Sequence, residues 1–505
     1  MVKPWGASRY RANGNAVGLL VAITIAPLQG HPMRSSSIES AASNSAYESF
    51  KHSTKRDDLV AQSIRRVLEQ LFSQTGQRIT FKLWDGTEFS VGNPSGQAGP
   101  RFTLILRDPR VLAKLIFGRN PLRVAQAYFA DEIDIDGDFY SALALKDHLH
   151  SIQLRAADKW RLLPNIARLF NAQLLTTRQS ANLSIAYEGT VKRHSKLENR
   201  DAIAFHYDLS NAFYALWLDP AMVYSCAYFE QPDASLEQAQ RAKLDLICRK
   251  LLLRPGEQFL DIGCGWGALA IHAARHYDVR ALGVTLSKEQ FLLARQRVAD
   301  AGLQDRVSIA LRDYRDLQGA AVFDKVASVG MFEHIGLKKL PTYFQTVHRL
   351  LKPGGLLMNH CITHSVEGWD NTSSTRFINQ FVFPDGQLDR VSNVQRGIED
   401  ANFEIFDLEN LRPHYALTLR HWVHRLEQHR RQALEIVSEA SYRVWRLYMA
   451  ACALALESDD IGVYQILSQK RGGQTALPLT RRHLVGSQCV NDLATPRSLN
   501  VASIG

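Results

Sequence analysis

Three glycines in the stretch Phe259–Gly267 constrain the fold of this chain more than any other feature. Gly263, Gly265 and Gly267 occupy alternate positions after an apolar run that ends in Asp261. A strand that turns into a helix through glycines lets a ligand lie against bare backbone at the N-terminus of that helix. A dinucleotide site is the nearest alternative, but no acidic residue follows the next strand to hold a ribose. The stretch therefore predicts a site for S-adenosylmethionine, with a turn that binds no ligand as the remaining alternative.

From Arg200 onward, apolar runs alternate with helical segments. The expected strands are Gln258–Leu260, Ala281–Val284, Val307–Leu311, Lys325–Val329 and Leu356–Asn359, and the expected helices are Ala268–Tyr277, Lys288–Ala301 and Leu340–Leu351. This alternation predicts parallel βαβ units in a doubly wound α/β sheet. Such sheets bind ligands beyond the carboxyl ends of their strands. Those ends carry Asp261, Thr285, Asp313, Met331–Glu333 and His360, so we expect the functional site there.

Residues 55–145 predict a separate, small α+β domain without a catalytic constellation. The expected helices are 57–72, 111–117 and 122–129, and the expected strands are 78–83 and 101–106. The stretch Asp131–Asp138 places five acidic residues within eight positions, a pattern that would suit a metal loop. Ile133 and Ile135 alternate with the acids, which favours a short strand with a solvated face and a turn at Gly137. No metal site is predicted.

The charge of the chain points to an anionic partner. The 505 residues carry a net charge of +10, and residues 141–200 hold 10 Lys/Arg against 4 Asp/Glu. Ile152–Phe170 mixes apolar and basic residues like an amphipathic helix that lies on an anionic phospholipid bilayer. A solvated helix packed by its apolar face is the alternative. Basic residues are not interleaved with a recognisable nucleic-acid-binding motif, so no nucleic acid is expected as a partner. A homodimer is left open.

The cysteines and the N-terminus bear on the compartment. The six cysteines are scattered and form no Cys-x-x-Cys pair, which favours reduced thiols in the cytoplasm, with the protein at the inner face of the membrane. The apolar run 16–28 follows Lys3, Arg9 and Arg11 as in a secretory signal. We interpret 1–54 as a disordered or mis-started extension, with Met33 as an alternative start and a loose membrane anchor as the other alternative. Residues 146–199 are interpreted as a basic helical linker, 200–471 as the catalytic domain and 472–505 as a flexible tail.

Six motifs in the second half of the chain resemble those of the cyclopropane-fatty-acyl-phospholipid synthases, a family that includes the mycolic acid cyclopropane synthases. The resemblance covers roughly 196–471 and, more weakly, the domain before it. The motifs are His206–Asn211, Tyr224–Tyr228, Leu260–Gly267, Gly283–Gln290, Arg312–Asp316 and Met331–Gly336. The resemblance implies a Rossmann-like class I methyltransferase. Its implied reaction moves a methylene from S-adenosylmethionine to the cis double bond of an unsaturated phospholipid acyl chain.

The resemblance also implies two sets of site residues. The cofactor would be bound by Tyr224, Ser225, Asp261, Gly263, Gly265, Gly267, Thr285, Gln290, Asp313 and Tyr314, with Asp313 accepting from the adenine amino group. A bicarbonate ion would remove the proton from a carbocation intermediate. Cys226, Glu333, His360 and Tyr415 would surround it, helped by the backbone of Ile362, and Cys452 matches a cysteine near that pocket. His334 is expected to make only a structural hydrogen bond.

Each assignment has a plainer alternative. Cys226 and Cys452 would otherwise be small buried apolar residues, and His360 a core histidine. Phe377, Phe381 and Phe383 would wall an acyl tunnel or simply belong to the core. A methyltransferase that forms methyl-branched or methylene acyl chains, or that acts on a small molecule, is the alternative within the fold. A cofactor-binding protein without catalysis, docked on a membrane or nucleic acid, is the alternative outside enzymes.

Overall fold

The chain divides into two compact units, residues 1–184 and 185–505. The computed structural model describes residues 45–72, 78–92, 101–108, 111, 121–145, 210–368, 372–384, 386–474 and 477–484. The amphipathic segment at 152–170 and the linker at 146–199 lie outside the described residues, as does the run at 16–28.

The first unit is a four-stranded sheet with helices; the strands predicted at 78–83 and 101–106 are present, whereas a strand at 88–91 was not predicted. The order of its strands is β2-β1-β3-β4, where β1 is Ile79–Lys82, β2 Glu88–Val91, β3 Phe102–Leu106 and β4 Ile133–Gly137. Helix α1 spans Ser45–Phe72 and therefore begins earlier than the predicted 57–72, and α3 spans Pro121–Phe129. Ile64 of α1 and Phe81 of β1 are completely buried in the core that joins helix and sheet.

The acidic stretch is a strand, as the alternation of Ile133 and Ile135 predicts. It forms β4, antiparallel to β3, with Ile133 buried. Arg107 donates to Asp131 at 3.1 Å and to Asp134 at 2.8 Å, which neutralises part of the acidic charge. Asp138 accepts from Ser141 N at 3.0 Å and caps α4, Phe139–Leu143. Among the described residues, no group of His, Cys, Asp or Glu is arranged to hold a metal ion.

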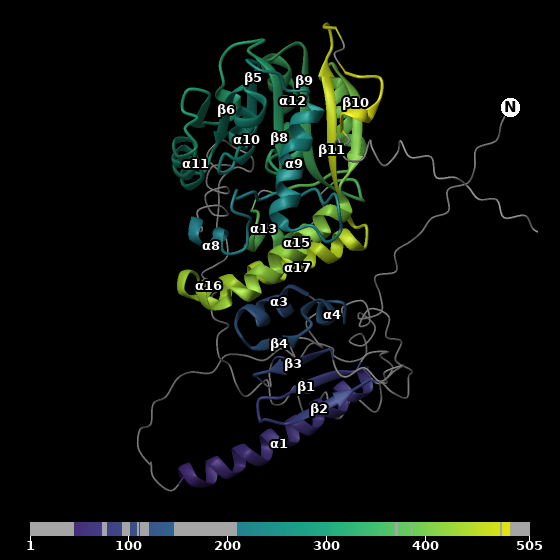
Figure 1. The fold of residues 1–505 in the computed structure, drawn as a ribbon. Helices are drawn as coiled ribbons and strands as arrows, with labels where there is room; N and C mark the ends of the chain where they lie inside the picture. Colours follow the sequence, from purple (N-terminus) through teal and green to yellow (C-terminus); the bar gives the residue numbers. More distant parts are fainter. Residues whose placement is uncertain are drawn as a thin grey trace, which may run out of the picture. The chain divides into compact units, whose positions relative to one another are not determined.

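The second unit is built on a seven-stranded sheet in the order β10-β11-β9-β8-β5-β6-β7 (Figure 1). The strands are β5 Gln258–Ile262, β6 Arg280–Thr285, β7 Val307–Leu311, β8 Phe323–Val329, β9 Leu351–His364, β10 Phe403–Asn410 and β11 Ile461–Lys470. The five strands predicted from the sequence are present and mutually parallel. The antiparallel strands β10 and β11, which complete the sheet beside β9, were not predicted.

Helices cover both faces of this sheet because consecutive strand residues point to opposite sides. Phe259 belongs to the core cluster that includes Ile247 and Ala270, whereas the adjacent Leu260 belongs to the cluster that includes Val347. The first cluster is formed with α9 Leu236–Lys250, α10 Ala268–Tyr277 and α11 Lys288–Asp300, and the second with α12 Leu340–Leu350 and α14 Val391–Asp400. The sheet is thus doubly wound, as predicted.

A helical layer lies at one end of the sheet (Figure 1). It contains α15 Arg412–Gln428 and α17 Glu439–Glu457, which pack against each other, and α16 Arg430–Ile436 between them in the chain. The smaller helices of this unit are α8 Asn211–Ala215 and α13 Ser373–Phe381. Among the described helices, none combines the length and the apolar character needed to cross a bilayer.

Part of the predicted tail lies against the second unit. The short 3-10 helix η5, Arg481–Leu484, contacts α9, where Arg249 donates to the carbonyl oxygen of Leu484 at 2.5 Å. Arg481 forms an ion pair with the buried Asp407 of β10. Residues 485–505 are outside the described residues.

Candidate active site

The glycine loop between β5 and α10 has the strand–turn–helix geometry that its sequence predicts. All three glycines have positive φ, +78° at Gly263, +52° at Gly265 and +81° at Gly267, a region that favours glycine. A Cβ on Gly263 would lie 2.9 Å from the Cβ of Met331, so this position also requires glycine for space. A Cβ on Gly265 would meet no atom within 4 Å. Gly265 therefore presents bare backbone to an open cavity.

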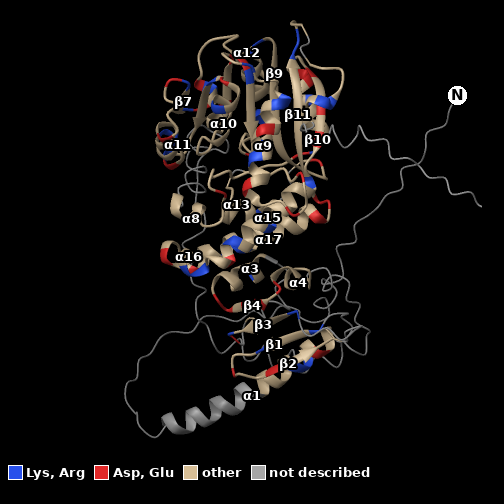
Figure 2. Ribbon diagram, viewed as in Figure 1, with Lys and Arg blue, Asp and Glu red and all other residues tan. Residues whose placement is uncertain are grey.

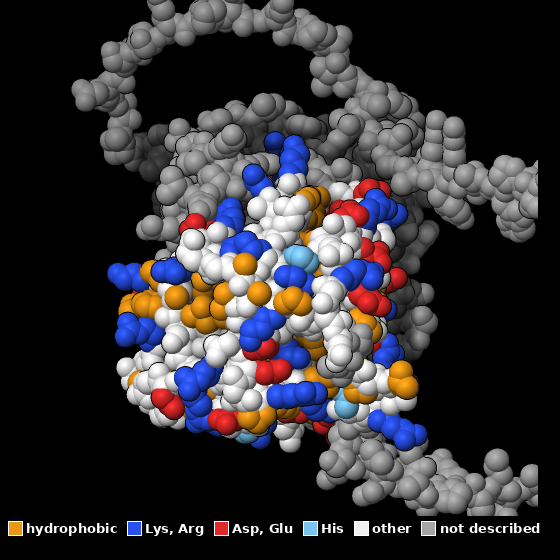
Figure 3. Space-filling view, turned by 90° about the horizontal axis from the view of Figure 1, so that it is seen from above, with side chains coloured by type: hydrophobic (Ala, Val, Ile, Leu, Met, Phe, Trp, Pro, Cys, Tyr) orange, Lys and Arg blue, Asp and Glu red, His pale blue; other side chains and the backbone are white. Residues whose placement is uncertain are grey.

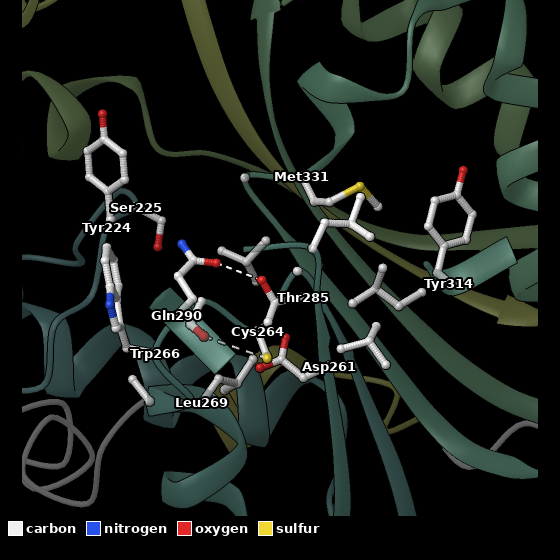
Figure 4. Close-up of a pocket in the computed structure, with 18 of the residues that line it drawn as sticks. Tyr224, Ser225, Asp261, Cys264, Trp266, Leu269, Thr285, Gln290, Tyr314 and Met331 are labelled. Atoms are coloured by element: carbon white, nitrogen blue, oxygen red, sulfur yellow. Dashed lines mark hydrogen bonds between the residues drawn. The ribbon is translucent and has the colours of Figure 1, made fainter. Parts of the chain in front are cut away.

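That cavity holds nearly all the residues predicted to bind the cofactor. Its walls come from the glycine loop, the end of β6, the turn after β7 and the segment 222–225. The lining residues from the predicted set are Tyr224, Ser225, Asp261, Gly263, Gly265, Thr285, Gln290, Asp313 and Tyr314. Gly267 does not line it and instead forms the N-cap of α10. Figure 4 shows Tyr224 and Trp266 on one side of the cavity and Tyr314 on the other.

Two side chains from β6 and α11 are fixed at the cavity by a hydrogen bond. Thr285 Oγ1 and Gln290 Oε1 are 2.7 Å apart, with the hydroxyl as donor (Figure 4). Ser287 caps α11 by accepting from Gln290 N at 3.2 Å, which places Gln290 at the start of that helix. Both Thr285 and Gln290 are about 5% exposed. The Gln290 amide nitrogen remains available to a ligand in the cavity, because the hydrogen bond with Thr285 uses only the amide oxygen.

Asp261 is an unpaired carboxylate at the floor of the cavity. It is 2% exposed at the end of β5, and its Oδ2 has no hydrogen-bond partner among the described residues. Burial raises the pKa of Asp261 to about 7, although nearby Lys243 acts to lower it. A buried acceptor without a donor is costly and marks a place where a ligand is expected to donate. The α-ammonium and ribose hydroxyls of S-adenosylmethionine are such donors, so the residues present fit this cofactor.

Lys243 of α9 was missed by the sequence analysis. It lines the same cavity, is 1% exposed, and donates to Ser225 Oγ at 2.8 Å. Burial lowers the pKa of Lys243 to about 8, against the effects of Cys226, Asp219 and Asp261. The lysine therefore supplies positive charge beside Asp261 and orients Ser225. Its position on a helix well before the glycine loop gives no local signal in the sequence.

Replacing Lys243 with Met is expected to weaken cofactor binding by about tenfold. The change keeps the volume of the side chain but removes the donor to Ser225 and the charge that favours ionised Asp261. Titration calorimetry with S-adenosylhomocysteine measures the effect. Lys325→Met is the matched control, since Lys325 is 6% exposed, pairs with Glu257 at 3.8 Å and does not line the cavity. Equal weakening in both variants would contradict a local role for Lys243.

Asp313 lies at the cavity but is already held by a cation. Arg315 Nε donates to its Oδ1 at 2.9 Å, and Arg315 NH2 donates to its Oδ2 at 2.5 Å. Asp313 also accepts from Arg315 N and caps the short 3-10 helix η2, Tyr314–Asp316. Each oxygen of a carboxylate has two acceptor sites, and Oδ1 accepts from both Arg315 N and Arg315 Nε, so one site on Oδ2 remains for a ligand. The expected contact with an adenine amino group stays a prediction.

A second buried carboxylate, Glu333, lies beyond the end of the neighbouring strand β8. It is carried by the 3-10 helix η3, Phe332–His334, between Met331 and His334, which both line the cavity. Ile362 N donates to Glu333 Oε1 at 2.6 Å, while Oε2 has no partner among the described residues. Burial raises the pKa of Glu333 to about 7 against the effect of the Ile362 amide. Ile362 N–H, expected to help bind an anion, is thus engaged by Glu333.

His360 lies two residues before Ile362 on β9, and its side chain therefore projects from the same face of the strand. It is 2% exposed, and its Nδ1 lies 3.2 Å from Gln465 Nε2 of β11. Burial, together with Lys243 and Lys250, lowers the pKa of His360 to about 3. The imidazole is therefore neutral at physiological pH. Gln465, like Lys243, was not predicted from the sequence.

Cys226 and Tyr415 are joined to this region through backbone contacts. Cys226 Sγ is 3.7 Å from the carbonyl oxygen of Leu411, and Leu411 N donates to Val463 O beside Ile362. Tyr415 follows Leu411 by one turn of α15 and is buried. Burial raises the pKa of Cys226 above its usual range, so the thiol is protonated and is a weak donor, not a nucleophile.

Cys452 is the predicted site residue with the weakest structural support. It is half-buried on α17, and burial raises its pKa to about 12 with Tyr448 as its polar neighbour. In the part of the chain that the structure describes, no hydrogen bond joins Cys452 to Glu333 or His360. His334, expected to have a structural role, packs its ring 5.1 Å from Phe383 and also lines the cavity.

Comparison with known proteins agrees with this geometry. The sequence model of the family described as mycolic acid cyclopropane synthetase matches residues 194–466. A probable fatty acid methyltransferase of Pseudomonas putida is 40% identical over 410 residues, 80% of this chain and 96% of the relative. The cyclopropane-fatty-acyl-phospholipid synthase of Escherichia coli K12 is 41% identical over 281 residues, 55% of this chain and 69% of the relative.

A solved structure supports the same relation. The mycolic acid cyclopropane synthase CmaA1, in complex with SAH and CTAB, is 35% identical with a TM-score of 0.51, over 54% of this chain and 98% of that one. The sheet, its glycine loop and the cavity define a Rossmann-like, S-adenosylmethionine-dependent class I methyltransferase of the cyclopropane synthase type. More narrowly, the chain belongs to the mycolic acid cyclopropane synthetase family, as the family match and the Pseudomonas relative show.

Proposed function

We propose that the chain is a cyclopropane-fatty-acyl-phospholipid synthase, which adds a methylene to the cis double bond of an unsaturated phospholipid acyl chain. The observation that carries this proposal is the pair of buried carboxylates that each keep one oxygen without a partner, Asp261 in the cofactor cavity and Glu333 beside it. Transfer of a methyl group to an amine or a hydroxyl also releases a proton, but that proton leaves a heteroatom and can pass to water. A second, dry acid–base site beside the first suits a reaction in which the new methyl group must also lose a proton.

The proposed reaction balances with one methyl group and one proton. The cofactor supplies a sulfonium methyl group, which the alkene attacks, so that a C–C bond forms and the C–S bond breaks to leave the thioether. The acyl chain then carries a carbocation. Removal of a proton from the new methyl group lets the C–H electron pair close the three-membered ring. Because an alkene is a poor nucleophile, fixed positions of the two reactants supply much of the rate.

The proposed functional residues form two sites, one for the cofactor and one for the base. Asp261, Gln290 and the glycine loop would orient the amino-acid tail and ribose of the cofactor. Glu333 and His360 would hold a bicarbonate ion, whose chemistry is to accept the proton. Two observations fit such an anion: the raised pKa of Glu333 favours its protonated form, which can donate to the anion, and the neutral His360 can donate a ring N–H. The bicarbonate and the roles of Cys226, Tyr415 and Cys452 are part of the proposal.

An aromatic cluster offers a dry environment for a cation. The ring of Tyr224, at the cofactor cavity, lies 5.2 Å from Trp422, 5.4 Å from Trp217 and 6.1 Å from Trp445. Trp217 and Trp422 are completely buried. Aromatic faces attract positive charge, and exclusion of water prevents a carbocation from being quenched. We propose that the double bond of the acyl chain is brought to this cluster.

We further propose that the enzyme acts at the anionic inner surface of the membrane, where its substrate lies. The net charge of +10 supports this, and in the part of the chain that the structure describes, Lys and Arg are spread over many elements (Figure 2). On the face shown in Figure 3, basic side chains lie between hydrophobic ones. Such a mixed surface suits a loose peripheral contact with anionic lipid headgroups. A homodimer remains a further proposal.

A second candidate reaction is the formation of a methyl-branched or methylene acyl chain. It is favoured by the Pseudomonas putida relative, which is called a probable fatty acid methyltransferase and matches 80% of this chain. That match is longer than the second unit, residues 185–505, and so extends into the first. A hydride shift from the carbon that bears the new methyl group to the cationic carbon, followed by loss of a methyl proton, would give the methylene chain. A saturated methyl branch would need, in addition, a hydride from a separate donor.

Mass spectrometry of the fatty acids from a host that lacks cyclopropane lipids tests the proposal. With this chain expressed, we expect a species one CH2 heavier than a monounsaturated acyl chain that resists hydrogenation. The same mass gain in a chain that still takes up hydrogen would indicate a methylene product, and two further hydrogens a methyl branch. Unchanged lipids, with cofactor binding intact in the purified protein, would contradict a lipid substrate.

A further inference from the structure

A chain of hydrogen bonds links Glu409, Lys250 and Gln465 to His360. His360 on β9 and Gln465 on β11 are direct partners across the two antiparallel strands, and Gln465 Nε2 lies 3.2 Å from His360 Nδ1. Gln465 Oε1 accepts from Lys250 Nζ at 2.9 Å. Lys250 Nζ in turn lies 2.5 Å from Glu409 and 3.5 Å from Asp407. Lys250 and Gln465 are completely buried.

The chemistry of these groups leaves one arrangement of protons. A lysine ammonium can only donate, so the atom of Gln465 that faces Lys250 must be the amide oxygen. The amide NH2 therefore faces His360, and because it too can only donate, Nδ1 of His360 must be the acceptor. A neutral imidazole carries one proton, which must then reside on Nε2. Glu409 and Asp407 form ion pairs with the Lys250 ammonium group at the other end of this chain of hydrogen bonds.

We propose that Lys250 and Gln465 are positioning residues that hold His360 in the tautomer with its proton on Nε2, so that His360 donates to the anion of the base site. This inference rests on the proposed function for the identity of that anion. The inference assigns different roles to His360 and Glu333. His360 binds and orients the anion but cannot accept a proton at Nε2, whereas Glu333, with one free oxygen, is the protein group that exchanges protons with it.

The tautomer can be measured directly in the full-length protein. Two-bond 1H–15N correlation spectra of [15N]histidine-labelled protein distinguish a protonated ring nitrogen from an unprotonated one, and the His360→Gln variant identifies the signals of His360. We expect His360 in the ligand-free wild type to carry its proton on Nε2 throughout pH 6–8. A proton on Nδ1, or an imidazolium ion, would overturn the inference without any assay of activity.

Two substitutions at position 465 separate positioning from packing. In Gln465→Glu, the carboxylate accepts from both Lys250 and His360, so the proton is expected to move to Nδ1. In Gln465→Met, the volume is kept but nothing sets the tautomer. Gln469→Met is the matched control, because Gln469 is 3% exposed on the same strand and bonds to Gly354 and Gln474 instead. An unchanged tautomer in Gln465→Glu would contradict the inference.

Steady-state kinetics then test the consequence for the anion. Loss of a hydrogen bond to a charged group predicts a rise of about tenfold or more in the KM for bicarbonate in Gln465→Glu. The KM for S-adenosylmethionine should stay within about twofold of the wild type, since Gln465 does not line the cofactor cavity. A rise in both constants would indicate general disruption and count against the inference. Wild-type activity that does not depend on bicarbonate would defeat the proposed base, while the tautomer measurement would still decide the role of Gln465.

Discussion

Glu333→Gln is expected to lower the rate of product formation by orders of magnitude and, at the same time, to stabilise the ligand-free protein above pH 7. The carboxylate has one unpartnered oxygen in a buried site, and burial raises its pKa from 4.5 to about 7. A glutamine keeps the shape and still accepts from Ile362 N, but it carries no charge to desolvate. We expect activity to fall by about 10²–10⁴-fold, the usual contribution of a general acid or base.

The gain in stability should depend on pH in a defined direction. Below about pH 4.5, the carboxyl group is protonated in the folded and unfolded chains alike, so the variant gains little. Between pH 4.5 and about 7 the unfolded chain loses the proton first, so the wild type becomes less stable as pH rises. Above about pH 7 the difference levels off, at a value on the order of 3 kcal/mol.

Thermal or urea unfolding at pH 5 and pH 8 measures this difference. Glu237→Gln is the contrasting control, because Glu237 pairs with Arg425 at 2.5 Å and its pKa is lowered by that partner despite some burial. That variant should lose stability at pH 8. If Glu333→Gln were also less stable than the wild type at pH 8, Glu333 would be a structural residue and not the proposed acid–base group.

Gly265→Ala is expected to weaken cofactor binding with little effect on the fold. The backbone of Gly265 has φ +52°, and a Cβ there would meet no protein atom within 4 Å, because it would project into the cavity. The methyl group would then occupy space needed by the ligand. Overpacking costs about 1–3 kcal/mol, which corresponds to a loss of roughly tenfold to a hundredfold in affinity.

Gly256→Ala is a matched control for this substitution. Gly256 also has positive φ, +81°, and a Cβ on it would meet nothing within 4 Å, but it does not line the cavity. Both variants should lose about 1–2 kcal/mol of stability from the left-handed backbone. Only Gly265→Ala should show weaker binding of S-adenosylhomocysteine by calorimetry. Unchanged affinity in Gly265→Ala would contradict placement of the cofactor against this loop.

The local parts of the fold and site could be predicted from the sequence. The strand β5, the glycine loop and α10 were predicted because a strand, a turn and a helix leave their signals in adjacent residues. The positions of Asp261, Thr285 and Asp313 followed from the rule that parallel strands bring their carboxyl ends together. The acidic stretch 131–138 was predicted to be a strand from the alternation of its isoleucines. In each case a periodic pattern of a few residues carried the information.

Only the tertiary structure decided which groups are free to act. Asp313 forms an ion pair with Arg315, and the Ile362 amide donates to Glu333. Lys243, on helix α9, places a positive charge near Asp261 at the end of strand β5. Gln465 contacts His360 on the neighbouring strand, although the two residues are 105 positions apart in the sequence. Pairing of distant strands is set by burial of whole faces and by register, which no short stretch of sequence encodes. The sequence by itself thus determined the kind of sheet and the place of the cofactor loop, whereas long-range packing determined the protonation and partners of the side chains at the site.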